Sequence, residues 1–229
     1  MAESTSTGFP SGFVRRNSPL EKILGEVGRA LQVLDGSAQA GRPNPAGPLP
    51  LAADQQETLS PAERQHAAGL MRVNHVGEIC AQALYRGQAM FCSDESIKGV
   101  LYQAAAEEVD HLVWCRERLD ELNSRPSLLN PLWYLGSFSL GALASNAGIP
   151  RNLGFMAETE RQVEQHLDGH LQDLPPQDTR SRRIVEQMRD DEIEHRTTAE
   201  THGASPLPTP VKLAMRLMSK VMTTTAYRI

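Results

Sequence analysis

Two Glu-x-x-His motifs are the residues of this chain that could do metal chemistry. Glu108 and His111 form the first motif, and Glu192 and His195 form the second. Residues three apart lie on one face of a helix, with Cβ atoms about 5–6 Å apart. A carboxylate and an imidazole at this spacing can therefore point at one metal ion inside a helical bundle. Taken singly, either pair could also be an ion pair on a helix surface.

Each motif follows a helix that offers a further glutamate. Glu78 comes 30 residues before Glu108, and Glu160 comes 32 residues before Glu192. Two Glu-x-x-His helices, with one glutamate from each of two others, are the pattern of ferritin-like di-iron proteins. Four buried carboxylates without metal would repel one another and would be costly to desolvate, whereas two divalent ions balance their charge. The spacing therefore predicts a dinuclear metal site.

Several neighbouring residues leave the ligand set open at this point. Glu107 lies four residues before His111 and is a rival to Glu108. Spacing alone does not choose among three glutamates of the third metal-binding helix: Glu158, Glu160 and Glu164. His75 and His166 also lie near candidate ligands, but such histidines more often support a ligand or fill the core than bind metal.

Helical periodicity places these residues on four long helices, at about 60–91, 95–123, 151–174 and 179–202. A capping box opens the first of them, with Ser60 at the cap and Glu63 three residues later. Two prolines, Pro175 and Pro176, separate the last two helices. The predicted fold is therefore all-α, a ferritin-like four-helix bundle.

The segment 126–150 contains no charged residue in 25 positions. A transmembrane helix has this length, but Asn130, Pro131 and Asn146 argue against one. If the second and third bundle helices run parallel, the chain must travel the length of the bundle between them. We therefore expect an apolar crossover helix here, whose surplus apolar face could rest on a membrane.

The two ends of the chain add further elements to a ferritin-like domain predicted at 60–229. Residues 1–59 read as a variable tail, a short helix at about 19–34 and a Pro/Gly-rich linker over 35–59. Apolar residues at helical spacing predict that this short helix packs against the bundle. The final segment 211–229 is amphipathic and has basic but no acidic residues, which suits an anionic lipid surface.

Composition narrows the class of protein and its compartment. The chain of 229 residues has a net charge of −5, which argues against a nucleic-acid partner. Its three cysteines form no C-x-x-C pair, which favours a reducing compartment over a disulfide framework. The first ten residues lack the apolar core of a secretory signal. We expect a bacterial protein on the cytoplasmic side.

Beyond the generic pattern, the sequence resembles the demethoxyubiquinone hydroxylase family over roughly residues 60–229. The similar stretches are MRVNHVGE at 71–78, EEVDHL at 107–112, AETE at 157–160 and MRDDEIEH at 188–195. The resemblance implies six iron ligands: Glu78, Glu108, His111, Glu160, Glu192 and His195. It thereby selects Glu160 in the third metal-binding helix and makes Glu108 and Glu192 the bridging carboxylates. Glu158 stands where the family pattern requires no acid.

The resemblance also implies an activity. It is the hydroxylation of a polyprenylated methoxy-methyl-benzoquinol in ubiquinone biosynthesis, with two iron ions, O2, and electrons from reduced quinol or NADH. Because the substrate's isoprenoid tail is insoluble in water, we expect a peripheral protein of the cell membrane. A homo-oligomer and a lipid-binding accessory protein are candidate partners. Two alternatives remain open: an iron-storage ferroxidase on the same bundle, and a non-enzymatic helical scaffold with surface glutamates and histidines.

Overall fold

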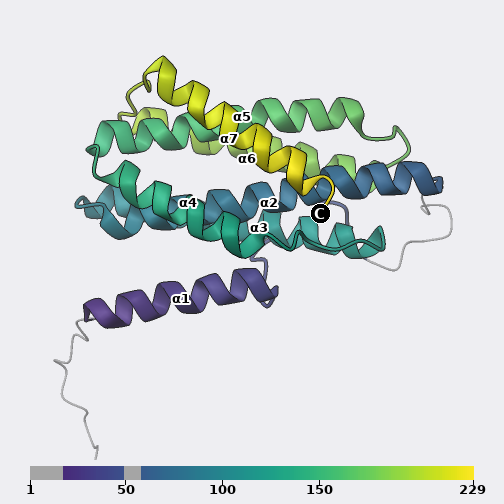
Figure 1. Cartoon of the computed structure of the whole chain (residues 1–229), viewed down its shortest axis with the longest axis horizontal. Coiled ribbons are helices and arrows are strands. Elements are labelled where there is room, and N and C mark those ends of the chain that lie inside the picture. Colours follow the sequence, from purple (N-terminus) through teal and green to yellow (C-terminus); the bar gives the residue numbers. More distant parts are fainter. Residues whose placement is uncertain (1–17, 49–57) are drawn as a thin grey trace, which may run out of the picture.

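A computed structural model describes residues 18–48 and 58–229, and all regular structure within these ranges is α-helical (Figure 1). The elements are α1 (Pro19–Asp35), α2 (Pro61–Phe91), α3 (Glu95–Glu121), α4 (Asn130–Ser145), α5 (Ile149–Asp173), α6 (Thr179–Thr201) and α7 (Thr209–Ala226). The predicted all-α class is confirmed, and the expected helices begin and end within a few residues of the observed ones. The predicted tail at 1–17 and the linker residues 49–57 lie outside the described residues.

Capping side chains fix where the bundle helices begin. In α2, the Glu63 amide donates to Ser60 Oγ, and the Ser60 amide donates to Glu63 Oε2 at 2.8 Å. Asp94 accepts hydrogen bonds from two amides of the first turn of α3, and Asp178 accepts one from Ser181 in α6. These caps satisfy amides that have no partner within the helix. They also set the register that carries the glutamates and histidines inward.

The helices α2, α3, α5 and α6 form the bundle, as two hairpins packed face to face (Figure 1). The helix α4 runs back along α2 from the end of α3 to the start of α5, so that α3 and α5 run in the same direction. The expected crossover helix is thus observed. Within the described residues, no helix is both long and apolar enough to cross a membrane.

Two glycines allow α4 to lie unusually close to α2. A Cβ atom on Gly87 would lie 2.2 Å from the Phe138 carbonyl oxygen, and one on Gly141 would lie 2.1 Å from the Leu84 carbonyl oxygen. These positions face each other across the crossing, so any side chain at either one would force the backbones apart. The close approach presses α4 onto α2, where it forms one wall of a cavity described below.

The prediction that α1 packs against the bundle is confirmed at its C-terminal end, but most of its apolar stripe takes no part in that packing. Leu20, Ile23, Leu24, Val27 and Leu31 are 49–63% exposed. The helix is held instead by Glu26, whose carboxylate receives two hydrogen bonds, at 2.6 and 2.8 Å, from the buried guanidinium of Arg86. Towards its C-terminal end, Ala30, Val33 and Leu34 pack on α2 and α4. In the middle of α1, the polar face that carries Glu26 therefore turns toward the bundle. The spacing of apolar residues along the helix could not reveal this orientation.

Candidate metal centre

The six predicted ligand residues gather in one buried layer of the bundle, and none is more than 5% exposed. Along each bundle helix they lie between two apolar clusters. In α3, for example, Leu101 and Ala105 belong to one cluster, and Trp114 and Leu119 belong to the other. The polar layer is thus closed at both ends by packed side chains, which exclude water and lower the local dielectric constant.

Within this layer the side chains form two overlapping groups. Glu78, Glu108, His111 and Glu192 make up the first group, and Glu108, Glu160, Glu192 and His195 make up the second. In each group, one ligand atom per residue lies within 4.8 Å of the others. Glu108 and Glu192 belong to both groups, so either carboxylate could contribute an oxygen to each of two metal positions. This is the geometry that the predicted ligand set requires.

Several oxygen and nitrogen atoms of the layer that could bind metal have no hydrogen bond. Glu108 Oε1, Glu160 Oε2, Glu192 Oε2 and His195 Nδ1 are buried without a hydrogen-bond partner. His195 Nδ1 lies 3.3 Å from Glu108 Oε1 and 3.6 Å from Glu160 Oε1, so these atoms face one another without bonding geometry. Buried polar atoms without partners are rare in native proteins. Lone pairs that converge on a common point are what a metal ion requires, so the residues fit a dinuclear centre.

The pKa shifts of these side chains also indicate a metal site, because they show how the metal-free layer would carry its charge. Burial, and then the nearby Glu108 carboxylate, raises the pKa of Glu78 well above its ordinary value, and burial with Glu192 does the same for Glu160. Burial opposes ionisation of Glu108 too, but the hydrogen bond from His111 and the nearby His195 imidazole lower its pKa. Against burial, carboxylates raise the pKa of both histidines. Without metal, protons must therefore neutralise the layer.

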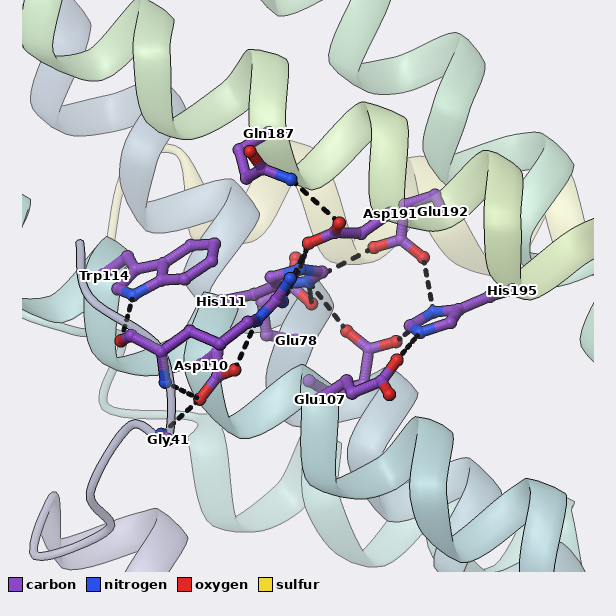
Figure 2. A network of polar contacts seen from close by, with 12 residues as sticks. Gly41, Glu78, Glu107, Asp110, His111, Trp114, Gln187, Asp191, Glu192 and His195 are labelled. Carbon is purple, nitrogen blue, oxygen red and sulfur yellow. Dashed lines mark hydrogen bonds and ion pairs between the residues drawn. The ribbon is translucent and has the colours of Figure 1, made fainter. Parts of the chain in front are cut away.

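A carboxylate outside the layer orients each histidine. His111 Nε2 lies 2.8 Å from Asp191 Oδ2, and His195 Nε2 lies 2.6 Å from Glu107 Oε2 (Figure 2). Each acid stands just before a bridging glutamate and reaches the histidine on the opposite helix. Because Nε2 donates outward, the Nδ1 lone pair is directed into the layer. The rival ligand Glu107 thus belongs to neither group and supports His195 instead.

The other candidate residues lie away from the layer. Glu158 pairs with Lys212 of α7 at 3.1 Å and with Arg161, and Glu164 pairs with Arg196. Of the three glutamates of α5, only Glu160 enters the layer, which is the choice that the family resemblance implied. His75 is buried with neither ring nitrogen hydrogen-bonded.

Sequence reasoning missed three residues that contact this centre. The Tyr85 hydroxyl donates to Glu160 Oε1 at 2.5 Å. Asp191 orients His111, and Arg42 of the linker holds Asp191 in turn, with 2.8 Å between Nη2 and Oδ2. A signal for Asp191 was present, since an acid precedes the glutamate in both motifs. Nothing in the local sequence pointed to Arg42.

A cavity of about 330 Å³ adjoins the layer between α2, α4, α5 and α7. Its walls are mainly apolar, and Glu78 forms part of its lining. His166 also lines it, with Nε2 buried and without a hydrogen bond. The exposed residues Val211 and Met218 of α7 lie at its rim, so the cavity extends from the surface to a predicted metal ligand.

The chain matches one protein family, and three of its relatives share one name. The family described as "Ubiquinone biosynthesis protein COQ7" matches residues 65–226. A protein of Bordetella parapertussis named 3-demethoxyubiquinol 3-hydroxylase is 64% identical over 224 residues, which are 98% of this chain and 99% of the relative. Proteins of the same name from Ralstonia pickettii and Xanthomonas campestris are 58% and 56% identical. These two alignments cover 92% and 93% of this chain, and 100% and 96% of the relatives.

Proposed function

Because this chain belongs to the COQ7 family of ubiquinone biosynthesis proteins, we propose that it is a 3-demethoxyubiquinol 3-hydroxylase. Relatives that match it over nearly their whole length bear this name. It is therefore an oxidoreductase of the monooxygenase type. The ferritin-like storage alternative shares the bundle and the ligand pattern, but the names of these relatives favour the hydroxylase.

The observation that carries the proposal is the apolar cavity that ends on Glu78. Its volume of about 330 Å³ falls within the range of small-molecule sites, which are largely apolar with a few polar groups. The exposed rim on α7 allows a long tail to leave the cavity while a ring lies inside. A storage protein that oxidises free ferrous ions has no need of such an apolar approach to its metal site.

We assign two iron ions to the layer, held by Glu78, Glu108, His111, Glu160, Glu192 and His195. When bound, the iron supplies the redox chemistry that activates O2. The surrounding residues do the rest. Asp191 and Glu107 keep Nε2 of the histidines protonated and Nδ1 directed inward. The apolar clusters on either side keep water out.

Asn74 is placed to orient the substrate ring. It lines the cavity four residues before Glu78, is buried, and its Oδ1 has no hydrogen-bond partner. A quinol hydroxyl that donates to this oxygen would remove the cost of the unpaired buried acceptor. The ring would then lie with its remaining C–H toward the metal layer. Electrons would come from the reduced quinol or from NADH.

The same surface supports a peripheral position at the cytoplasmic face of the cell membrane. Exposed apolar residues gather on α7 and α4: Leu213, Leu217, Met218 and Val221 on the first, and Leu132, Leu135 and Leu143 on the second. The helix α7 also carries lysine and arginine without acidic residues, which suits anionic lipid. The cavity rim lies on α7, so a polyprenyl tail could pass directly between lipid and protein. A homo-oligomer or a lipid-binding accessory protein would have to leave this face accessible.

Quinone profiling tests the activity. In cells that lack the native gene and carry this chain as Glu192→Ala, we expect the demethoxy intermediate to accumulate and ubiquinone to disappear. Glu194→Ala is the matched control, because Glu194 is an exposed glutamate two residues further along α6. The control should restore a normal profile. A normal profile with Glu192→Ala would refute the proposed function.

A further inference from the structure

The described part of the linker between α1 and α2, residues 36–48, is held against the bundle although these residues form no helix. Its Gly41 amide donates to Asp110 Oδ1 of α3 at 2.6 Å, and Asn44 Nδ2 donates to Glu117 at 2.7 Å. Further along, the Ala46 carbonyl accepts a hydrogen bond from Arg180 at the start of α6. These contacts join the linker to both helices that carry the Glu-x-x-His motifs. They fix the backbone on either side of Arg42.

The Arg42 guanidinium bridges α3 and α6 through Asp110 of α3 and Asp191 of α6. Its Nε donates to Asp110 Oδ2 at 2.7 Å, and its Nη2 donates to Asp191 Oδ2 at 2.8 Å. Its Cζ lies 4.9 Å from the centre of the Trp114 ring, which forms a cation–π contact. An arginine with three such contacts has little freedom to move.

Arg42 and His111 meet on the same oxygen. His111 Nε2 lies 2.8 Å from Asp191 Oδ2, the atom that also accepts from Arg42. Among the residues that the structure describes, the one further contact that holds Asp191 comes from Gln187, which donates to its other oxygen. With Arg42 in place, Oδ2 has a fixed position between the guanidinium and the imidazole. The direction of His111 Nδ1 toward Glu78, Glu108 and Glu192 depends on that position.

In the described part of the chain, the second half of the centre has no equivalent of Arg42. The carboxylate that supports His195 is Glu107, whose side chain is 38% exposed and whose other hydrogen bond comes from Gln103. Among the described residues, no arginine or lysine forms a salt bridge with Glu107. The two metal positions therefore have similar predicted ligands. They differ in the residue that holds the supporting carboxylate, which is Arg42 for Asp191 and Gln103 for Glu107.

We propose that Arg42 is a positioning residue that acts through Asp191 on His111 and strengthens one of the two metal positions, the one built on Glu78. This inference rests on the proposed metal centre, and it assigns a role to a linker that precedes the part of the chain matched by the family, residues 65–226. Loss of an outer carboxylate–histidine contact commonly lowers metal affinity by about 10–100-fold. Removal of Arg42 should have an effect of this kind at one position only.

Metal titration of the full chain tests the role without any turnover. We expect wild-type protein to bind two Co²⁺ ions under anaerobic conditions, each with its own visible absorption change. Arg42→Gln should bind one ion as wild type does and the other about 10–100-fold more weakly. Arg42→Lys should recover part of the loss, because a lysine can reach only one of the two aspartates at a time. The matched control is Arg189→Gln, which removes an α6 arginine paired with Asp190 and Asp168.

A double-mutant cycle separates positioning from general stability. Asp191→Asn should lose at least as much affinity at this position as Arg42→Gln, and the double variant should lose no more than Asp191→Asn alone. Additive losses, equal weakening of both ions, or unchanged binding in Arg42→Gln would each overturn the inference. If wild-type protein binds no metal, the proposed centre itself fails. If it binds two ions and Arg42→Gln does so equally well, only the role of Arg42 is refuted. Unfolding curves of the metal-free variants show whether each variant is folded.

Discussion

Replacement of Gly141 by alanine tests how α4 is held on α2. A Cβ atom there would lie 2.1 Å from the Leu84 carbonyl oxygen and 3.0 Å from the Gln88 amide nitrogen. Both atoms belong to the helix backbone and cannot rotate away. To reach ordinary contact, from 3.4 Å upward, the two helices must separate by more than an ångström.

Two opposing terms set the size of the effect. Alanine is favoured over glycine inside a helix by about 1 kcal/mol. Overpacking of a close interface costs about 1–3 kcal/mol, and occasionally more. Because the whole α2–α4 contact opens, the second term should exceed the first, and we expect a net loss of up to about 2 kcal/mol in the free energy of unfolding. For a chain of this size, each kcal/mol lowers Tm by about 2–4 °C.

Gly136→Ala provides the control within the same helix. Nothing lies within 4 Å of a Cβ atom at Gly136, so this variant should gain up to about 1 kcal/mol. Urea unfolding of both variants at equal metal content measures the difference. Since Trp133, Ser137 and Leu140 of α4 line the cavity, Gly141→Ala should also bind a quinone analogue more weakly. Equal stability of the two alanine variants would show that the reasoning about the close approach is wrong.

Two further predictions concern the metal and the membrane. Metal binding should release protons, because Glu78, Glu160 and both layer histidines have raised pKa values in the metal-free protein and must lose their protons to bind. Calorimetry in buffers of different ionisation enthalpy measures this release, and release of none would contradict the prediction. Lys220→Glu, on the exposed side of α7, should weaken binding to anionic vesicles about five- to thirtyfold, whereas Arg183→Glu on α6 should not. Sedimentation with vesicles measures the binding of both variants. If the wild-type protein does not bind anionic vesicles, the membrane proposal is ruled out.

Much of the fold followed from local patterns. Capping boxes and a 3.6-residue period located the helices, and the lack of charge in 126–150 together with the need for parallel helices predicted the crossover. These features depend on hydrogen bonds and burial within one segment, so a sequence expresses them directly. The Glu-x-x-His spacing likewise pointed to the buried layer, because it records which residues share a face of one helix.

Other parts of the site depended on contacts between distant segments. Glu160 is distinguished from Glu158 and Glu164 by the rotation of α5, which packing against its neighbours decides. The outward-facing stripe of α1 shows the same limit, since periodicity identified an apolar face but not which way it turns. A helix is rotated by its tertiary contacts, and a buried pair such as Glu26 with Arg86 can outweigh an apolar face.

The sequence by itself determined the helices, their order and the residues able to bind two metal ions. Only the tertiary structure decided how that centre is supported. Arg42 meets Asp191 across a separation of 149 residues. No local pattern can encode such a contact, because it exists only when α3, α6 and the linker have packed together. The two Glu-x-x-His pairs were visible as motifs, whereas the linker residue that supports one of them was not.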